Sequence, residues 1–405
     1  CHSGTTTSPA VSIPPLHPLM EYLGMSDQIQ DLKKQTSTFL SDNRAELIEL
    51  SEWLHAHPEI AWEEVESSKR CAEFLRERGF SVEHPYLGFE TAFRAVKGRG
   101  NFTIGIMAEY DALPGIGHAC GHNLIASMSI GAGLALASVA DELGISVEVI
   151  GTPAEEGKGG KIEMLDRGAF TNLDFAMMAH PAPVDVARAR PFAVLHWEIN
   201  FSGHAAHAAS YPTQGINAAD AFTVSEVAIG LLRQQLPPTV RVHGMITKGG
   251  DAPNAIPHRT QGRWYVRAST MDELEETSKK VINCFEAGAL ATGCTVAIED
   301  ESKPYSDFVT DEDGLSFYEA NAVALGRDLR TEGPETLMCH ASTDFANVSH
   351  VTRAIHPYIG VECYPVLNHQ AEFADACTGE IANKTLLDGA TALAWTGIDV
   401  ANAEK

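Results

Sequence analysis

The sequence is short of features that would place it at a membrane or on nucleic acid. No run of about 18 apolar residues occurs in its 405 residues, so no membrane-spanning helix is expected. Basic residues are scarce, because 29 Lys and Arg stand against 54 Asp and Glu, and the formal net charge is -25. Such a chain is a poor partner for nucleic acid or an anionic membrane. These absences favour a soluble, acidic globular enzyme.

Disulfide and export signals are also missing. The eight cysteines show neither a disulfide-like pattern nor Cys-x-x-Cys spacing, which fits a reducing compartment. Residues 1–18 are rich in Ser, Thr and Pro and are expected to form a loose arm without the basic and apolar stretches of a signal peptide. Because the chain begins with Cys1, the N-terminus can also be a processed one. We expect a cytoplasmic protein, with secretion as the alternative.

Short apolar strands alternate with helices in the first half of the chain. The expected strands cover 103–108, 147–150 and 175–179, and the expected helices cover 26–57, 63–78, 123–142 and 160–168. This order predicts parallel βαβ units in a layered α/β/α domain. Asp111, the pair Glu155-Glu156 and His180 each follow one of these strands. Since ligands bind beyond the carboxyl ends of parallel strands, the three clusters are expected to converge.

The pattern changes near residue 191. Strands are expected at 194–201, 240–248, 260–269 and 295–299, with helices at 215–235 and 271–291. This β-α-β-β-α-β order predicts a small ferredoxin-like α+β insert. We therefore expect a main domain of residues 19–190 and 305–405 and an inserted domain of residues 191–304.

Cys120-Gly121-His122 is a candidate metal-binding element. A thiolate and an imidazole suit a borderline-soft ion such as Zn²⁺, and Gly121 lets the backbone turn so that both face one ion. A Gly-rich turn with an incidental Cys and His explains the same pattern. The adjacent carboxylates Glu155 and Glu156 favour the metal hypothesis, because one can bind a metal while the other stays free as a general base.

Two further histidines are candidate ligands. His180 follows an apolar strand, where a lone His is more often a satisfied core group than a ligand. His369 lies far downstream, and many of the seventeen histidines compete with it on sequence grounds. The residues alone leave this choice open.

Several separated motifs resemble one known family. Tyr110-Asp111-Ala112-Leu113-Pro114, Cys120-Gly121-His122-Asn123, Glu155-Glu156, His180-Pro181 and the element around His369 occur in the order of the di-zinc metallopeptidases of family M20. This family holds aminoacylase, carboxypeptidase G and the plant indole-acetyl-amino-acid hydrolases. The likeness is greatest to its Cys-ligand branch, with aminobenzoyl-glutamate hydrolases and β-alanyl-lysine-type dipeptidases, and runs from Leu54 to His369.

The resemblance implies a role for each motif residue. The implied ligands of two Zn²⁺ ions, with Mn²⁺ or Co²⁺ as alternatives, are Cys120, His122, Glu156, His180 and His369. Glu155 would be the general base. Asp111 would orient a ligand, although capping a turn explains it equally well. Many members of the branch have Asp where this chain has Asn123, and the missing charge would weaken the second metal site.

The inserted domain resembles the family's lid and dimerisation domain. His207 fits a lid element whose His, in relatives, reaches the active site of a partner subunit and binds the scissile carbonyl oxygen. An exposed lid residue is the simpler explanation. Asn254 and Arg267 match lid positions that contact substrate, with Arg263 competing for the role of Arg267. These matches imply a homodimer formed through the lid.

The predicted function is metal-dependent hydrolysis of the amide bond in a small N-acyl amino acid or dipeptide. Glu155 would deprotonate a metal-activated water, His207 would hold the oxyanion, and Arg267 with Asn254 would orient the free carboxylate of the substrate. Two alternatives use the same scaffold: a biosynthetic enzyme that forms or transfers an acyl bond, and a metal-binding protein without activity. An intact Glu155 argues against the latter, because binding alone needs no base.

Overall fold

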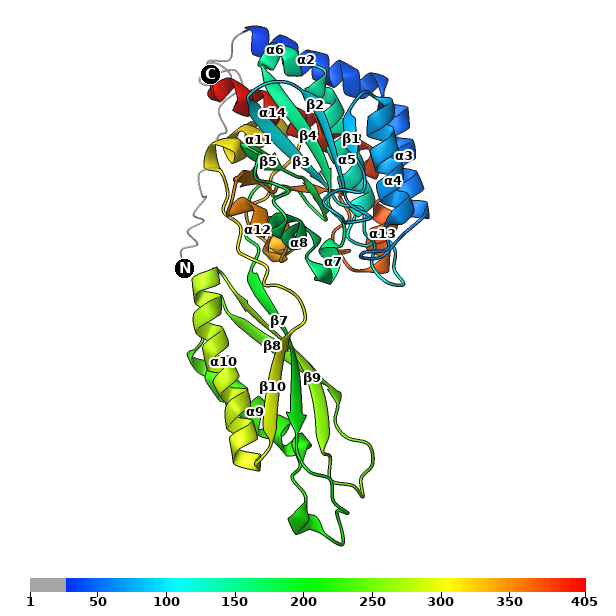
Figure 1. Cartoon of the computed structure of the whole chain (residues 1–405). Coiled ribbons are helices and arrows are strands. Elements are labelled where there is room, and N and C mark those ends of the chain that lie inside the picture. The colour runs from blue at the N-terminus through cyan, green and yellow to red at the C-terminus, as the bar shows by residue number, and fades with distance from the viewer. Residues whose placement is uncertain (1–26) are drawn as a thin grey trace, which may run out of the picture.

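The structure is a computed structural model that describes residues 27–405. The arm predicted for residues 1–18 lies outside the described residues. A large domain contains the central sheet, and a smaller, elongated lid projects from it, so that β7 starts beside α8 and runs away from the large domain (Figure 1). No helix among residues 27–405 has both the length and the apolar character needed to cross a bilayer.

The large domain is built on a six-stranded mixed sheet with the order β1-β2-β4-β3-β5-β11. Its strands are β1 (Ser81–Glu83), β2 (Phe93–Gly98), β3 (Phe102–Ala108), β4 (Ile145–Gly151), β5 (Phe175–Met177) and β11 (Arg353–Ile355). β3 runs parallel to both β4 and β5. A separate parallel pair joins β6 (His180–Ala182) to β12 (Tyr358–Gly360). The expectation of parallel units holds for β3, β4 and β5, but β1 and β2 add an antiparallel edge.

Helices cover both faces of this sheet. They are α2 (Asp27–Asp42), α3 (Arg44–Ala56), α4 (Val65–Glu77), α5 (His122–Ala137), α6 (Ala140–Leu143), α7 (Glu155–Lys158), α8 (Gly160–Asp166), α11 (Glu312–Ala324), η3 (Pro334–His340), α12 (Phe345–Ser349), α13 (Ala371–Ala376) and α14 (Gly379–Ala403). Ile104 and Ile106 of β3 pack on the side of α2, α5 and α14, while Met107 packs on the side of α8 and α12. The predicted layered α/β/α fold is thus observed.

Two predicted helices are each broken. The segment predicted as one helix over 26–57 ends at Asp42 and restarts at Arg44, and the one over 123–142 is divided into α5 and α6. All sixteen residues of α5 are buried, because this helix is apolar on every side and lies between the sheet, α3 and α14. Its first residue, His122, belongs to the predicted metal element, so the most buried helix of the domain carries that side chain.

The lid is a four-stranded antiparallel sheet, ordered β10-β7-β9-β8, with two helices on one face. Its elements are β7 (Ala193–Ser202), η1 (Pro212–Gln214), α9 (Ala218–Leu232), η2 (Arg233–Gln235), β8 (Arg241–Lys248), β9 (Arg259–Ala268), α10 (Met271–Thr292) and β10 (Thr295–Asp300). The chain order β-α-β-β-α-β is the predicted one. Phe201, Phe222, Trp264 and Phe285 form its aromatic core beneath α9 and α10.

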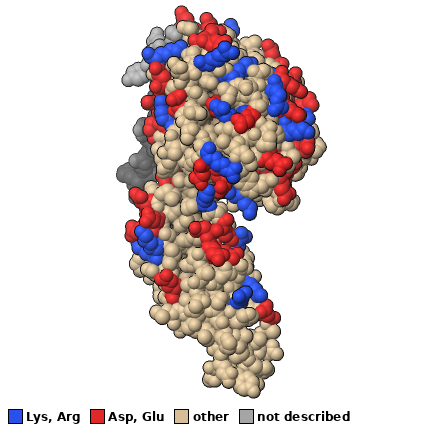
Figure 2. Space-filling model, viewed as in Figure 1, with Lys and Arg blue, Asp and Glu red and all other residues tan. Residues whose placement is uncertain are grey.

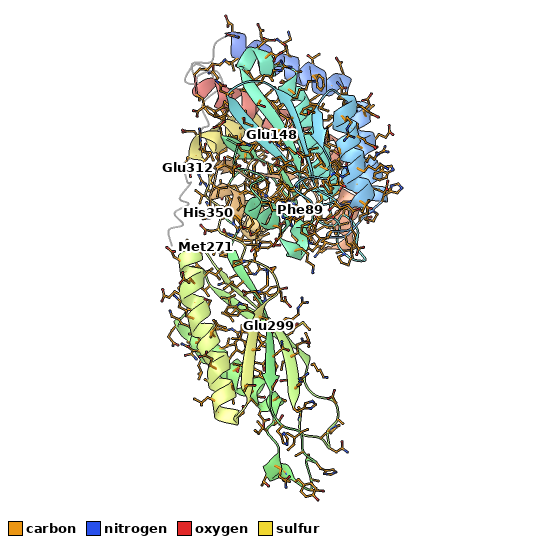
Figure 3. All side chains as sticks on the ribbon, viewed as in Figure 1. Phe89, Glu148, Met271, Glu299, Glu312 and His350 are labelled. Atoms are coloured by element: carbon orange, nitrogen blue, oxygen red, sulfur yellow. The ribbon has the colours of Figure 1, made fainter. Side chains whose placement is uncertain are left out.

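The two domains meet where α10 begins. Met271 donates its backbone N–H to Asp307, and His350 at the end of α12 contacts the carbonyl oxygen of the same residue. Met271 and His350 lie together at this junction in Figure 3. The boundaries 191 and 304 remain a prediction, although β7 and β10 place the sheet of the lid between them.

Candidate metal centre and active-site cleft

Polar side chains from separate strand ends meet at one edge of the central sheet. Asp111 follows β3, Glu155 and Glu156 follow β4, and His180 opens β6 after β5. The distance from Cys120 Sγ to His180 Nε2 is 3.6 Å, and that from Glu156 Oε1 to His369 Nε2 is 3.3 Å. The parallel strands explain this convergence, because their carboxyl ends face the same side.

The five predicted ligands form two donor sets that share Cys120. Donor atoms of Cys120, His122 and His180 lie within 4.8 Å of one another, and so do those of Cys120, Glu156 and His369. A thiolate common to both sets suits a pair of neighbouring cations. Glu155 lies beside them, within the same distance of donors of His122 and Glu156.

Asp111 connects the two halves of this centre. Its Oδ1 lies 2.9 Å from His122 Nδ1, and its Oδ2 accepts the backbone N–H of Glu156 at 2.9 Å. Burial raises the pKa of Asp111, but His122 and the N–H of Glu156 outweigh this effect and lower it below its ordinary value. The contact to Nδ1 leaves Nε2 of His122 available to a metal, and the orienting role of Asp111 stays a prediction that this contact fits.

His180 is held by backbone contacts. Its Nδ1 lies 2.8 Å from the carbonyl oxygen of Pro181, which leaves Nε2 facing Cys120. Burial lowers the pKa of His180 to about 4, so the imidazole is neutral, the form that binds metals. Asn368 donates to the same Pro181 oxygen and places His369, whose φ of 68° is unusual for a residue other than glycine, at the rim of the centre.

The backbone at the two adjacent carboxylates is not helical. Glu156 has φ -69° and ψ 84°, which breaks the short α7, and Ala154 before the pair has a φ of 58°. Glu155 is buried, and Tyr305 donates its hydroxyl to the Glu155 carbonyl oxygen at 3.0 Å. Burial, then Glu109, Glu156 and Asp344, raise the pKa of Glu155 well above its ordinary value.

The donors fit a divalent cation. Within the described part of the chain, His122 Nε2 and Glu156 Oε1 are buried atoms that make no hydrogen bond. Buried polar atoms in proteins are normally hydrogen-bonded, so these two atoms, each beside another candidate donor, suit a metal ion as their partner. Thiolate, imidazole and carboxylate are the donors that Zn²⁺ takes.

A cleft with a volume of about 550 Å³ opens from this centre toward the lid. Cys120, Glu155, Glu156, His180 and His369 line one side. The lining also includes side chains that the sequence analysis does not single out, namely His196 and Tyr265 of the lid sheet and Tyr305 and Met338 of the large domain. These four residues are hard to predict from the sequence, because each lines the cleft only when the lid sheet lies against η3.

Arg267 is the lid arginine that faces the cleft. Its Nη1 donates to Ser342 Oγ at 2.7 Å, and within residues 27–405 no carboxylate forms an ion pair with it. Arg263 instead pairs with Glu301 on the exposed face of the lid. Of the two arginines, Arg267 lines the cleft, and its role in binding substrate stays a prediction.

His207 and Asn254 lie far from the cleft of their own chain. They follow the distal ends of β7 and β8, where the backbone N–H of Ala208 donates to the Asn254 carbonyl oxygen. The ten residues of β7 separate them from the cleft by about 30 Å, at about 3.3 Å per residue. Asn254 therefore lies too far from Arg267 for the two to contact one small substrate within a subunit, and its role stays a prediction.

Comparison with known proteins agrees with this geometry. Residues 105–380 match the peptidase family M20/M25/M40. The Xaa-Arg dipeptidase of Mus musculus is 39% identical over 92% of this chain and 90% of its own length. One subunit of the p-aminobenzoyl-glutamate hydrolase of Escherichia coli (strain K12) is 30% identical over 66% of this chain and 60% of its own length. The chain belongs to peptidase family M20.

Two solved structures have a similar fold. A putative aminohydrolase from methicillin-resistant Staphylococcus aureus has a TM-score of 0.77 at 22% identity, covering 91% of this chain and 99% of that one. A dinuclear metal binding peptidase of family M20 from Bacillus subtilis has a TM-score of 0.64 at 21% identity, covering 87% and 98%. M20 peptidases are dinuclear metal enzymes, and this M20 protein is a hydrolase acting on amide bonds, as predicted.

Proposed function

We propose that this M20 enzyme cleaves dipeptides and related N-acyl amino acids that carry a free carboxylate and a basic C-terminal residue. The proposal is carried by one observation: two donor sets share Cys120, and Glu155 stands beside them facing a cleft that Arg267 lines. The name of the mouse relative, Xaa-Arg dipeptidase, supports a basic C-terminal residue. The net charge of -25 favours cationic over anionic substrates.

Each side chain of the cleft has a task in this mechanism. Zn²⁺, or Mn²⁺ or Co²⁺ in its place, bound by Cys120, His122, Glu156, His180 and His369 would polarise the scissile carbonyl and acidify a water. Glu155 takes the proton of that water and delivers it to the leaving nitrogen. Arg267, held by Ser342, binds the substrate carboxylate with its guanidinium fork.

The contribution of His207 requires a second subunit. The lid offers an interface for it, because β8 is an edge strand with the exposed side chains Met245 (61%) and Ile246 (39%), and the neighbouring α9 exposes Val227 and Leu231. In the view of Figure 2 the distal part of the lid carries few charged side chains, whereas they are dense over the large domain. A homodimer through β8 and α9 would bring His207 and Asn254 of one subunit toward the cleft of the other.

Replacement of the base tests the chemistry. Glu155→Gln should lower kcat by about 10²–10⁴-fold while the zinc content stays that of the wild type. Glu163→Gln, a surface carboxylate paired with Lys303, is the matched control and should leave kcat unchanged. The substrates are dipeptides ending in Arg, Lys, Ala or Glu. Their products are identified by mass spectrometry, with either water or an added amine as the acceptor. Normal turnover by Glu155→Gln would remove the assignment, and amide formation in place of hydrolysis would favour the biosynthetic alternative.

Subunit mixing tests the dimer. Glu155→Gln and His207→Ala chains are each expected to be poorly active, yet mixed dimers contain one cleft with both wild-type residues. Activity of the mixture should therefore exceed that of either variant alone. Mixtures without this gain, or a wild-type protein that sediments as a monomer, would refute a role of His207 across subunits.

The seven described cysteines are all free, which supports a cytoplasmic location.

A further inference from the structure

Lys161, the second residue of α8, lies buried behind the metal centre. It is 0% exposed, and its ammonium donates to Glu109 Oε1 at 2.5 Å and to Asp344 Oδ1 at 2.7 Å. Its backbone N–H also donates to Asp344 Oδ2 at 2.8 Å. Lys161 thereby joins three segments that are distant in sequence: the end of β3, the start of α8 and the start of α12.

The ammonium keeps its charge despite complete burial. Burial lowers the pKa of Lys161, but the carboxylates of Asp344 and Glu109 outweigh this effect and raise it above its ordinary value. A buried lysine with two carboxylate partners is a strong positional constraint, because moving either partner leaves a charge without compensation.

Glu109 uses just one of its two oxygens in this contact. Its Oε2 is buried without a hydrogen-bond partner in the described residues and lies 3.6 Å from His122 Nε2. That nitrogen is also buried without a partner, because Asp111 contacts the other ring nitrogen. A lone pair and a carboxylate oxygen repel each other unless a proton or a metal cation lies close to both. A divalent cation held by His122 would remove this repulsion, because carboxylate oxygens and imidazole nitrogens are both donors that Zn²⁺ takes.

We propose that Lys161 is a positioning residue that holds Glu109 with its free oxygen directed at the metal-binding nitrogen of His122, where Glu109 gives the bound cation a further anionic contact. Neither Lys161 nor Glu109 is among the five ligands of the proposed function, on which this inference rests. The second Glu109 oxygen, without a hydrogen-bond partner and 3.6 Å from His122 Nε2, is the observation that carries the inference.

Glu109→Gln is the decisive variant, because it keeps the size of the side chain and an acceptor for Lys161 while removing the negative charge near His122. Zinc affinity is measured by competition with a chromogenic chelator. Loss of a partner outside the ligand set typically weakens metal affinity by about 10–100-fold, and we expect this for Glu109→Gln. Thermal unfolding of the metal-free form is recorded in parallel, so that a loss of affinity with little change in Tm identifies positioning. Wild-type zinc affinity of Glu109→Gln would overturn the inference.

Lys161→Met tests the lysine, with Lys33→Met as the matched control. Lys33 is a second buried lysine, on α2, away from the cleft. Zinc affinity should fall for Lys161→Met and stay unchanged for Lys33→Met; equal effects of the two would contradict a role specific to Lys161. His180→Ala separates this inference from the proposed function. If that variant binds zinc as tightly as the wild type, the assignment of the metal centre fails, whereas a loss there with intact Glu109→Gln binding refutes just the role of Glu109 and Lys161.

Discussion

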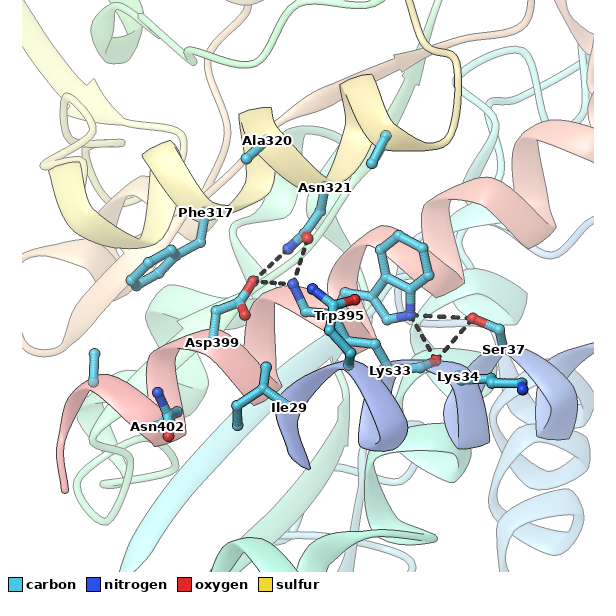
Figure 4. A pocket seen from close by; sticks show the side chains of 13 residues that line it. Ile29, Lys33, Lys34, Ser37, Phe317, Ala320, Asn321, Trp395, Asp399 and Asn402 are labelled. Atoms are coloured by element: carbon cyan, nitrogen blue, oxygen red, sulfur yellow. Dashed lines mark hydrogen bonds and ion pairs between the residues drawn. The ribbon is translucent and has the colours of Figure 1, made fainter. Parts of the chain in front are cut away.

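Two buried lysines in the large domain show how the surroundings of one charge differ near the metal centre and far from it. Lys33 of α2 donates to Asp399 at 2.7 Å and to Asn321 at 2.8 Å, and so connects α2, α11 and α14. Figure 4 shows these three side chains together with Trp395, whose indole donates to the Lys33 carbonyl oxygen at 2.9 Å. Lys161 likewise connects three segments, but with two carboxylates in place of one.

The number of carboxylate partners decides whether the pKa of the buried lysine is lowered or raised. Burial lowers the pKa of Lys33, and Asp399 offsets this effect incompletely, whereas the pKa of Lys161 is raised. Lys33 also borders a groove of about 550 Å³, so water can approach it, while Lys161 and both of its partners are fully buried. The buried lysine behind the metal centre thus has two carboxylate partners, whereas Lys33 at the helix junction has one.

The largest effect is expected when Lys161 is removed. Lys161→Met leaves Glu109 and Asp344 buried without a cation, which should lower the free energy of unfolding of the metal-free protein by about 3–5 kcal/mol. Urea unfolding followed by circular dichroism measures this change. A loss below that of Lys33→Met would contradict the comparison.

Lys33→Met should have a smaller effect. Asp399 still accepts a hydrogen bond from Asn321 at 2.9 Å, and the adjacent groove admits water, so a loss of about 1–3 kcal/mol is expected, the range for an unsatisfied buried group. kcat, KM and zinc content should remain those of the wild type. A fall in zinc content would show that the helix junction and the metal centre are coupled.

The sequence predicts the strands and helices of the protein better than the side-chain contacts between them. Strand and helix periodicity predicts β3, β4, β5 and the β-α-β-β-α-β lid, because the apolar pattern is strong in each. The break at Asn43 is not predicted, since apolar residues continue through it at helical spacing. The antiparallel β1 and β2 are also missed, because β1 is three residues long and β2 is half polar.

The candidate site is predicted where a motif stands at a strand end, as for Asp111, Glu155 and His180. Lys161 carries no such signal, because a lysine near the start of a helix after a Gly-rich turn is ordinarily exposed. Its burial depends on Glu109 and Asp344, which are 52 and 183 residues away in sequence. The roles predicted for His207 and Asn254 rest on the proposed homodimer, because both residues follow the distal ends of lid strands.

Paired replacements sharpen the comparison at a smaller scale. Lys33→Met/Asp399→Leu removes both charges of the helix junction and should restore stability to within about 1 kcal/mol of the wild type, because apolar side chains commonly replace a buried ion pair without loss. Lys161→Met/Glu109→Gln should remain destabilised, since Asp344 keeps a buried charge whose remaining donor is the Lys161 backbone N–H. Urea unfolding of the four metal-free variants measures both recoveries. Equal recovery in the two regions would show that the second carboxylate has no special role.

Raising the pH into the alkaline range should change the stability contributed by the two lysines in opposite directions, by a modest amount. The folded-state pKa of Lys33 is below its ordinary value of 10.5, so between those two pKa values the unfolded chain binds more protons, and the stability due to Lys33 grows as pH rises. The folded-state pKa of Lys161 is above 10.5, so its contribution is complete below that pH and declines above it. The stability gap between wild type and Lys33→Met should therefore widen as pH rises toward 10.5, while the gap to Lys161→Met stays constant and then narrows above 10.5. Urea unfolding at a series of pH values measures both gaps, and gaps that change in the same direction below pH 10.5 would refute the distinction between one and two carboxylate partners.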